Sequence, residues 1–292
     1  MPKPPISPYH VSEKPGEDQK RKTWKAAIVD CVTVEFESFS RSVAEALDAI
    51  EASEQISRQR SVLIKPNLVN GQPHPITTSP ECCEAVIEYV RRHSKAEILL
   101  AEGCGDAAVE TGEIFERLGY KSLSGRHGVP LIDLNHCPVR KLDNPECPVF
   151  PEIYLPDIAF TSCIVSVPVL KAHSLAGLTG TLKNMVGFAP PQYYSGQSGV
   201  WKKAAFHGRM QESLIDLNRY LVPDITLMDC SVGMAEYHLG GPHCNPPVNR
   251  IIAGFNPWEV DRKAAGLLGM NWQDIGHVAV GGSGPPSPRA AQ

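Results

Sequence analysis

The sequence predicts an α/β protein of Rossmann-like character, with a mostly parallel sheet, flanking helices and a small Pro-rich flap. Short apolar runs rich in Val and Ile recur along the chain, and segments with a helical period separate them, which is typical of parallel strands joined by crossover helices. Four runs stop at a charged residue, namely Lys65, Glu102, Lys171 and Asp229. Since the carboxyl ends of parallel strands meet at one edge of a sheet, we expect these charges to lie close together. A strand that simply returns to solvent ends in the same way, so each charge taken alone has a second explanation.

Strands and helices alternate along the chain. The apolar runs predict strands at 26–33, 61–65, 97–101, 129–134, 160–167, 224–229 and 249–253. Segments with helical periodicity predict helices at 40–52, 79–92, 110–118, 207–220 and 257–268. This order is that of repeated βα units, which places successive strands side by side in one sheet.

Two of the expected helices have clear boundaries in the sequence. Before the helix at 79–92, Thr77, Thr78 and Ser79 are possible N-caps, Pro80 suits the first turn, and Glu81 lies near the positive end of the helix dipole. Gly119 follows the helix at 110–118 and predicts its end. These signals support the predicted start of the first helix and the predicted end of the second.

The domain organisation follows from composition. Residues 1–23 are polar and Pro-rich and residues 282–292 are rich in Gly, Pro and Ser, so we expect flexible tails around a single α/β domain at 24–281. Five prolines in 135–159 predict short edge strands and turns that form the flap. The irregular stretch 187–206 is a candidate lid, and a loop packed by its own Tyr and Trp side chains explains it equally well.

Composition also restricts the partners. The chain has 292 residues, of which 42% are apolar and 21% charged, and its formal net charge is −4. It has neither the basic patch expected of a nucleic-acid-binding protein nor an apolar run of the roughly 20 residues needed to cross a bilayer. We therefore expect a cytoplasmic protein without nucleic-acid or membrane partners, and a homo-oligomer stays open.

The nine cysteines argue against a disulfide framework, because their number is odd and several fall inside apolar strands. No C-x-x-C spacing occurs, so we expect neither an iron–sulfur cluster nor a zinc ribbon. The pairs His136-Cys137, with Cys147, and His243-Cys244 could be metal fragments or could pack their loops. The cofactor is unknown from the sequence, and a divalent metal stays open.

Residues 167–188 hold the densest chemistry. Lys171 and His173 are two apart near the end of an extended strand, so their side chains leave on the same face. Glycines then bracket Thr179, Lys183 and Asn184, a composition that lets backbone N–H groups approach a ligand while lysine supplies charge. The Walker A spacing is absent, so the block favours a small anion over a nucleoside triphosphate. Close helix–sheet packing with solvated lysines is the alternative.

Other segments add candidates to this block. Pro66 holds Lys65 in extended geometry before Asn67. Glu102 begins a glycine-containing loop in which a carboxylate could hold a cation, orient a lysine or act as a base. Asp229 ends another strand, and His207 begins a helix and could join His173.

Several of these motifs occur together in one family. They are Ile64 to Asn67, Thr77 to Pro80, Glu102-Gly103, Pro168 to His173, Thr179-Gly180, Lys183-Asn184, Gly187, Asp229, Gly241-Pro242 and Asp261. Together they resemble the domain of unknown function 362 family over about residues 26–270, and the block from Lys-x-His to Leu-Lys-Asn is the most specific part. Many members carry ferredoxin-type cysteine clusters, which this chain lacks, so the resemblance implies no intrinsic electron transfer. A more distant likeness of fold and of Lys/His-rich sites connects the chain with the nickel-pincer lactate racemases by analogy.

The residues together predict an enzyme that acts on a small molecule bearing a carboxylate or a phosphate. The expected substrate-binding residues are Lys65, Asn67, Thr179, Lys183 and Asn184. The expected catalytic residues are Lys171 as nucleophile or electrostatic stabiliser, His173 as acid or base, and Glu102 and Asp229 as orienting groups or proton acceptors.

Two other functions stay open at this stage. The chain could be a metal- or cofactor-dependent isomerase or redox enzyme of nickel-pincer racemase-like type, with His173, His207 and a carboxylate as metal ligands. Alternatively, it could be a non-catalytic binding or scaffold protein that works with a separate redox partner. The metal content of the purified protein and ligand binding without turnover would distinguish these functions.

Overall fold

The main sheet organises the computed structural model, which describes residues 30–196 and 201–281. Among these residues it contains nine strands: β1 (Cys31–Glu35), β2 (Ser61–Pro66), β3 (Glu97–Glu102), β4 (Leu131–Asp133), β7 (Cys163–Val167), β8 (Val169–His173), β9 (Gly177–Thr179), β10 (Ile225–Met234) and β11 (Arg250–Gly254). The order is β1-β11-β10-β7-β2-β3-β4, in which the neighbours from β10 to β4 are parallel and β11 is antiparallel to both β10 and β1. The expected α/β fold with a mixed, mostly parallel sheet is confirmed.

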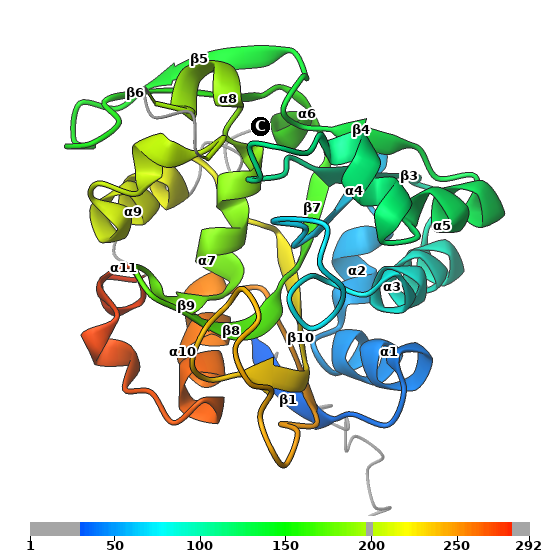
Figure 1. The fold of residues 1–292 in the computed structure, drawn as a ribbon. Helices are drawn as coiled ribbons and strands as arrows, with labels where there is room; N and C mark the ends of the chain where they lie inside the picture. Colours follow the sequence, from blue (N-terminus) through cyan, green and yellow to red (C-terminus); the bar gives the residue numbers. More distant parts are fainter. Residues whose placement is uncertain (1–29, 197–200, 282–292) are drawn as a thin grey trace, which may run out of the picture.

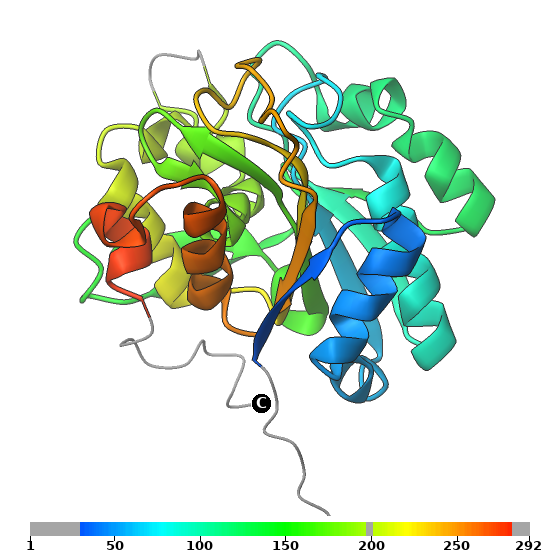
Figure 2. The ribbon, with the colours of Figure 1, turned by 90° about the horizontal axis from the view of Figure 1, so that it is seen from below.

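Helices cover both faces of the sheet (Figures 1 and 2). One face carries α1 (Phe39–Ala49), α2 (Ala52–Ile56), α3 (Pro80–His93), α4 (Thr111–Arg117) and α5 (Tyr120–His127). The other carries α7 (Thr181–Asn184), α9 (Met210–Tyr220), α10 (Pro257–Leu267), η3 (Trp272–Asp274) and α11 (Gly276–Ala279). The short helices α6 (Ile158–Thr161), η1 (Met185–Phe188), α8 (Pro191–Tyr194) and η2 (Ala204–Phe206) lie in the connections.

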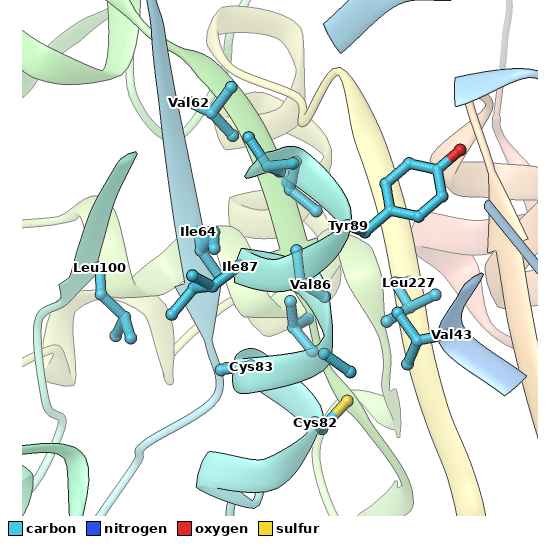
Figure 3. Close-up of a cluster of buried hydrophobic side chains, with 14 of the residues drawn as sticks. Val43, Val62, Ile64, Cys82, Cys83, Val86, Ile87, Tyr89, Leu100 and Leu227 are labelled. Carbon is cyan, nitrogen blue, oxygen red and sulfur yellow. The ribbon is translucent and has the colours of Figure 1, made fainter. Parts of the chain in front are cut away.

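Side-chain alternation along the strands separates the two layers of the core. In β2, Val62 and Ile64 pack with α3 in one apolar cluster, which Figure 3 shows, whereas Leu63 packs in a second cluster on the opposite face. Because side chains of a strand alternate between faces, Lys65 lies on the face of Leu63, away from α3. The strand thus delivers a lysine to the face that carries α7 and α9.

The helix α3 begins as the sequence predicts. Ser79 accepts a hydrogen bond from the backbone N–H of Cys82 at 3.2 Å, and Pro80 occupies the first turn. The expected helix at 110–118 ends at Arg117, and Gly119 with a φ of 84° separates it from α5, which the sequence did not predict.

Several element boundaries differ from the sequence expectations. The expected strand at 224–229 continues as β10 to Met234, and the expected helix at 207–220 begins only at Met210. The expected helix at 40–52 is split into α1 and α2, and Glu51 between them has a φ of 56°. The first residues of the expected strand at 160–167 belong to α6, so β7 begins only at Cys163. Pro168 then ends β7, and β8 continues as a separate strand that pairs with β10 and β9. Of the expected strand at 26–33, only residues from 30 onward are described.

The expected flap is an antiparallel hairpin of β5 (Val139–Asp143) and β6 (Glu152–Pro156), which form a two-stranded sheet of their own. Its buried residue Ile153 belongs to the same apolar cluster as Tyr194 and Phe206 from the candidate lid. The described part of 187–206 is thus anchored by buried aromatic side chains, and residues 197–200 lie outside the described residues. The lid itself stays a prediction.

The expected tails at 1–23 and 282–292 also lie outside the described residues. In the part of the chain that is described, no helix combines the length and the apolar character that crossing a membrane requires.

Candidate functional site

A cavity of about 290 Å³ lies at the ends of β2, β3, β8 and β9 and extends along α7 and η1. The sequence-predicted residues that line it are Lys65, Asn67, Glu102, Lys171, His173, Thr179, Lys183, Asn184 and His207. Lys203 and His238, which the sequence did not predict, line it as well. Four lysines therefore face one cavity whose lining includes a single carboxylate.

Lys65 has a complete set of hydrogen-bond partners. It is fully buried, and its Nζ lies 2.7 Å from Glu102 Oε1, 2.8 Å from the Pro66 carbonyl and 3.2 Å from Asn184 Oδ1. An ammonium group has three N–H donors, so these three acceptors use all of them. Burial lowers the pKa of Lys65, and the charge of Glu102 opposes this effect. Lys65 thus contributes charge to the cavity but has no free N–H for a ligand.

Glu102 is equally well satisfied. Its Oε1 also accepts the N–H of Gly103 at 2.7 Å, and its Oε2 accepts the N–H of Leu68 at 2.7 Å. Glu102 is thus the counter-ion of Lys65 and is held in place by two backbone amides, which agrees with the orienting role expected from the sequence. Its role as a proton acceptor stays a prediction.

Gly187 allows this pair to form. A Cβ at position 187 would lie 2.4 Å from Glu102 Oε1 and 2.5 Å from the Lys65 Nζ, distances at which atoms clash. Only glycine lets η1 pass so close to the ion pair. Gly187, which belongs to the motif set in the sequence, thus lets η1 pack directly against the Lys65–Glu102 pair.

Asn184 connects α7 with β2 next to the Lys65–Glu102 pair. Its side-chain NH₂ donates to the Lys65 carbonyl at 3.2 Å and to Ser166 Oγ at 2.9 Å, while its Oδ1 accepts from Lys65. All its polar atoms therefore have protein partners. These bonds position Lys65, and the substrate-binding role of Asn184 stays a prediction.

Lys171 differs from Lys65 in its partners. It is 1% exposed and donates one hydrogen bond, to the carbonyl of Ile76. Two of its three N–H donors have no acceptor among the described residues. Burial first, and then the charge of Lys183, lower the pKa of Lys171 to about 7. Near neutral pH, Lys171 can therefore both accept and donate a proton.

Lys183 has no hydrogen-bond or ion-pair partner among the described residues. Burial lowers its pKa to about 8. Its helix, α7, is only four residues long and is held by Asp261, whose carboxylate accepts the N–H groups of Thr181 at 2.6 Å and Leu182 at 3.1 Å. Burial raises the pKa of Asp261 to about 6. Asp261 therefore positions Lys183 without lining the cavity.

Lys203 comes from the segment that the sequence treats as a lid. Its Nζ donates to Asn135 Oδ1 and to the Ala189 carbonyl, which leaves one N–H without an acceptor among the described residues. Burial lowers its pKa to about 7. No periodicity or strand end marks residue 203, so the sequence holds no signal that places it at the cavity.

The histidine at position 173 has a defined tautomer. Its Nδ1 accepts backbone N–H groups from Leu175 at 3.1 Å and from Ala176 at 3.2 Å. Because Nδ1 is the acceptor, a neutral ring carries its proton on Nε2. Burial and then Lys183 strongly lower the pKa of His173. A neutral His173 thus has an N–H donor at Nε2, and its role as an acid or base stays a prediction.

Two further histidines line the same cavity. His238 stacks on His173, with ring centroids 3.8 Å apart, and burial followed by Lys183 lowers its pKa to about 4. Burial and then Lys183 also lower the pKa of His207, which is partly exposed. The surroundings of all three histidines therefore favour the neutral form of the ring.

Two other predicted residues offer free polar atoms. The hydroxyl of Thr179 and the Oδ1 of Asn67 are buried and have no hydrogen-bond partner in the described part of the chain. Both residues line the cavity. Buried polar groups are rarely left unpaired, so these two atoms are suited to contact a ligand.

Asp229 is the exception among the predicted site residues, because it does not line the cavity. Its Oδ1 accepts the N–H and the hydroxyl of Ser231, and its Oδ2 lies 3.0 Å from His74 Nε2. In β10 it shares the parity of Ile225 and Leu227, which pack with α3 on the opposite face of the sheet. The expectation that Asp229 ends its strand is wrong, because β10 continues to Met234, and the side chain faces the other layer.

The structure does not bring His173, His207 and a carboxylate together as a group of metal ligands either. Within the described residues, the group whose ligand atoms lie within 4.8 Å of one another is Glu110, Asp133 and His136, and it contains neither His173 nor His207. Metal binding through Nε2 of His173 would also require Nδ1 to donate, and here Nδ1 accepts. The cysteines at 137 and 147 do not join His136 in this group.

The comparisons with known proteins concern the family alone. No curated protein and no solved structure matches the chain. The family described as a domain of unknown function (DUF362) matches residues 62–266, which include β2 with Lys65, the block from Lys171 to Gly187, and Asp261. Since this match covers more than half of the sequence, the chain belongs to the DUF362 family.

Proposed function

We propose that this protein is an enzyme that binds a small organic anion, bearing a carboxylate or a phosphate, among Lys171, Lys183 and Lys203. The observation that carries the proposal is the set of unpaired lysine N–H donors in one cavity. Lys183 has three, Lys171 has two and Lys203 has one that find no acceptor among the described residues. The carboxylate in the lining, Glu102, is already paired with Lys65. An anion would supply the missing acceptors.

Electrostatics supports the same conclusion. The pKa values of Lys171 and Lys203 fall to about 7 and that of Lys183 to about 8, in each case mainly because burial disfavours the charged ammonium group. A bound anion would provide the counter-charge and raise all three pKa values. Binding would therefore be coupled to proton uptake, which is a signature that a packing role for these lysines does not predict.

The chemistry that we propose rests on Lys171 and His173. A lysine with a pKa near 7 is matched to proton transfer at neutral pH and is partly present as the free amine that attacks a carbonyl group. The Nε2–H of neutral His173 would donate to an oxygen on which negative charge develops. Thr179 would add a second donor from its unpaired hydroxyl. These roles assign acid–base or nucleophilic chemistry to the lysine and stabilisation of charge to its neighbours.

Binding is tested by thermal unfolding of the wild type and of Lys183→Met with a panel of carboxylates and phosphates. A true ligand at a hundred times its dissociation constant should stabilise the wild type by about 2.7 kcal/mol and the variant far less. Lys121→Met is the matched control, since Lys121 lies on the surface and pairs with Glu116, away from the cavity. Equal stabilisation of all three proteins would exclude the cavity as the anion site.

Chemistry is tested separately from binding. Borohydride reduction in the presence of 2-oxo acids, followed by peptide mass spectrometry, would trap an imine on Lys171 or Lys183 if either acts as a nucleophile. Turnover without trapping, and with a pH profile near 7, would indicate acid–base chemistry. Tight binding without turnover or trapping would favour the scaffold alternative, and stoichiometric metal in the active protein would favour the metal-dependent one.

A further inference from the structure

The size of the cavity exceeds that of a simple anion. Its volume of about 290 Å³ corresponds to about ten water molecules at their share of about 30 Å³ each in the liquid. Sulfate or acetate would occupy a small part of this space. The anionic group of a natural ligand therefore accounts for one end of the cavity, and the remainder is available for a larger molecular body.

The two ends of the cavity differ in character. The lysines 171 and 203 and the threonine at 179 are all at most 5% exposed, so they form its inner end. Leu175 and Tyr237 also line it, but they are 52% and 46% exposed and therefore lie at its mouth. Only four large apolar side chains are exposed among the described residues, and these are two of them.

Other apolar side chains also line the cavity. They are Val186, Phe206, Met210 and Leu239. Apolar surface around a few polar groups is typical of pockets that hold organic ligands, and exposed apolar side chains at a mouth are costly unless something covers them. The walls therefore fit an apolar body attached to the anionic group.

A row of rings connects the two ends. His173, whose neutral ring belongs to the polar end, stacks on His238 with centroids 3.8 Å apart, and His238 meets Tyr237 edge-on at 4.9 Å. Aromatic faces and edges of this kind pack well against another ring. The row gives an extended apolar ligand a continuous surface from the lysines to the mouth.

From this polarity we infer that the ligand is an amphipathic organic anion, with a carboxylate or phosphate at the lysines and an apolar, ring-sized body that extends toward Leu175 and Tyr237. The inference rests on the proposed function, because it presupposes that the lysines hold the anion. It adds the substrate class: an aryl or branched acyl acid or its phosphate counterpart, as opposed to a small polar acid.

The test compares anions of equal charge. Isothermal titration calorimetry of the wild type would measure acetate against 3-phenylpropionate, and inorganic phosphate against phenyl phosphate. We expect the aromatic member of at least one pair to bind about ten- to a hundredfold more tightly, because its ring leaves water for the apolar wall. The pair that shows the gain identifies the anionic group.

Two variants assign the gain to the two ends. Tyr237→Ala, at an exposed position, should reduce the advantage of the aromatic ligand several-fold and leave the affinity for acetate or phosphate unchanged, whereas Lys183→Met should weaken all four ligands. Equal affinity within both pairs, with binding that still requires Lys183, would overturn the inference and leave the proposed function intact. Absence of binding by all four anions, or binding that is indifferent to Lys183, would overturn both.

Discussion

Lys65 and Lys183 line the same cavity, yet their surroundings are opposite. Lys65 donates to three acceptors, including the carboxylate of Glu102 at 2.7 Å, and the absence of a side chain at Gly187 leaves room for this pair. Lys183 meets no acceptor among the described residues. The cavity thus has a closed region, formed by Lys65, Glu102 and Asn184, and an open region, formed by Lys171, Lys183 and Lys203.

The comparison shows that a lysine in the lining of the cavity is not by its position alone a ligand-binding residue. In the closed region every charged group and every side-chain amide has a partner within the protein. Loss of one partner should therefore destabilise the fold around the cavity. In the open region the donors are unused, so loss of a lysine should cost ligand binding more than stability. Each prediction below tests this division.

The largest effect should follow from Lys65→Met. The change leaves Glu102 buried without its cation, and removal of one partner of a buried ion pair typically costs about 3–5 kcal/mol of unfolding free energy. Urea denaturation of the variant and the wild type measures this loss. The double variant Lys65→Met with Glu102→Gln should recover part of it, because it also removes the unpaired charge. A loss below about 1 kcal/mol in the single variant would contradict the division.

A smaller loss should follow from Asp261→Asn. The amide keeps one acceptor oxygen, so either Thr181 or Leu182 loses the partner of its N–H, at a cost of about 1–3 kcal/mol. Because α7 carries Lys183, the affinity for an anion should fall as well. Denaturation and calorimetry on the same preparations separate the two effects. Unchanged affinity in a destabilised variant would show that Asp261 stabilises the fold without positioning the lysine.

Lys183→Met should be more stable than the wild type at pH 7, by at most about 3 kcal/mol, because it removes a charge that burial disfavours and breaks no hydrogen bond with a described residue. Anion binding should be lost in the same protein. Denaturation curves with and without a bound anion measure both quantities. A strongly destabilised variant would place Lys183 in the closed region.

The stability advantage of Lys183→Met over the wild type should shrink as the pH rises. The pKa of Lys183 is about 8 in the folded protein and 10.5 in the unfolded chain, so between these values the unfolded wild type binds more protons and wild-type stability rises with pH. From pH 7 to pH 9 the advantage of the variant should fall by about 1 kcal/mol. Buried cysteines, whose pKa values are raised, act in both proteins and cancel in the difference. A constant difference would mean that Lys183 titrates like a free lysine.

The sequence predicts the open region better than the roles within it. Lys171 and Lys183 are recognisable because a strand end and closely spaced glycines surround them. The saturation of Lys65 was not predictable, since its acceptors come from Glu102 and Asn184, and hydrogen-bond counts arise only from the tertiary structure. Lys203 was missed because it lies in a connection without periodicity.

Asp229 illustrates a different limit. Strand β10 is buried on both faces, and its sequence shows no regular alternation of apolar and polar residues that would tell one face from the other. The parallel direction of the strands was predictable from their apolar runs and crossover helices. The face that receives the side chain of Asp229 was not.

The central claim is that Lys171, Lys183 and Lys203 form an anion site, and proton uptake tests it most directly. Sulfate is a suitable probe, because it remains a dianion near neutral pH. Calorimetric titration at pH 8.5 in two buffers of different ionisation enthalpy would give the number of protons exchanged on binding. The account predicts net proton uptake by the wild type, as the anion raises the lowered lysine pKa values, and less uptake with weaker binding in Lys183→Met. Sulfate binding without proton uptake, or with the same uptake in the variant, would contradict it.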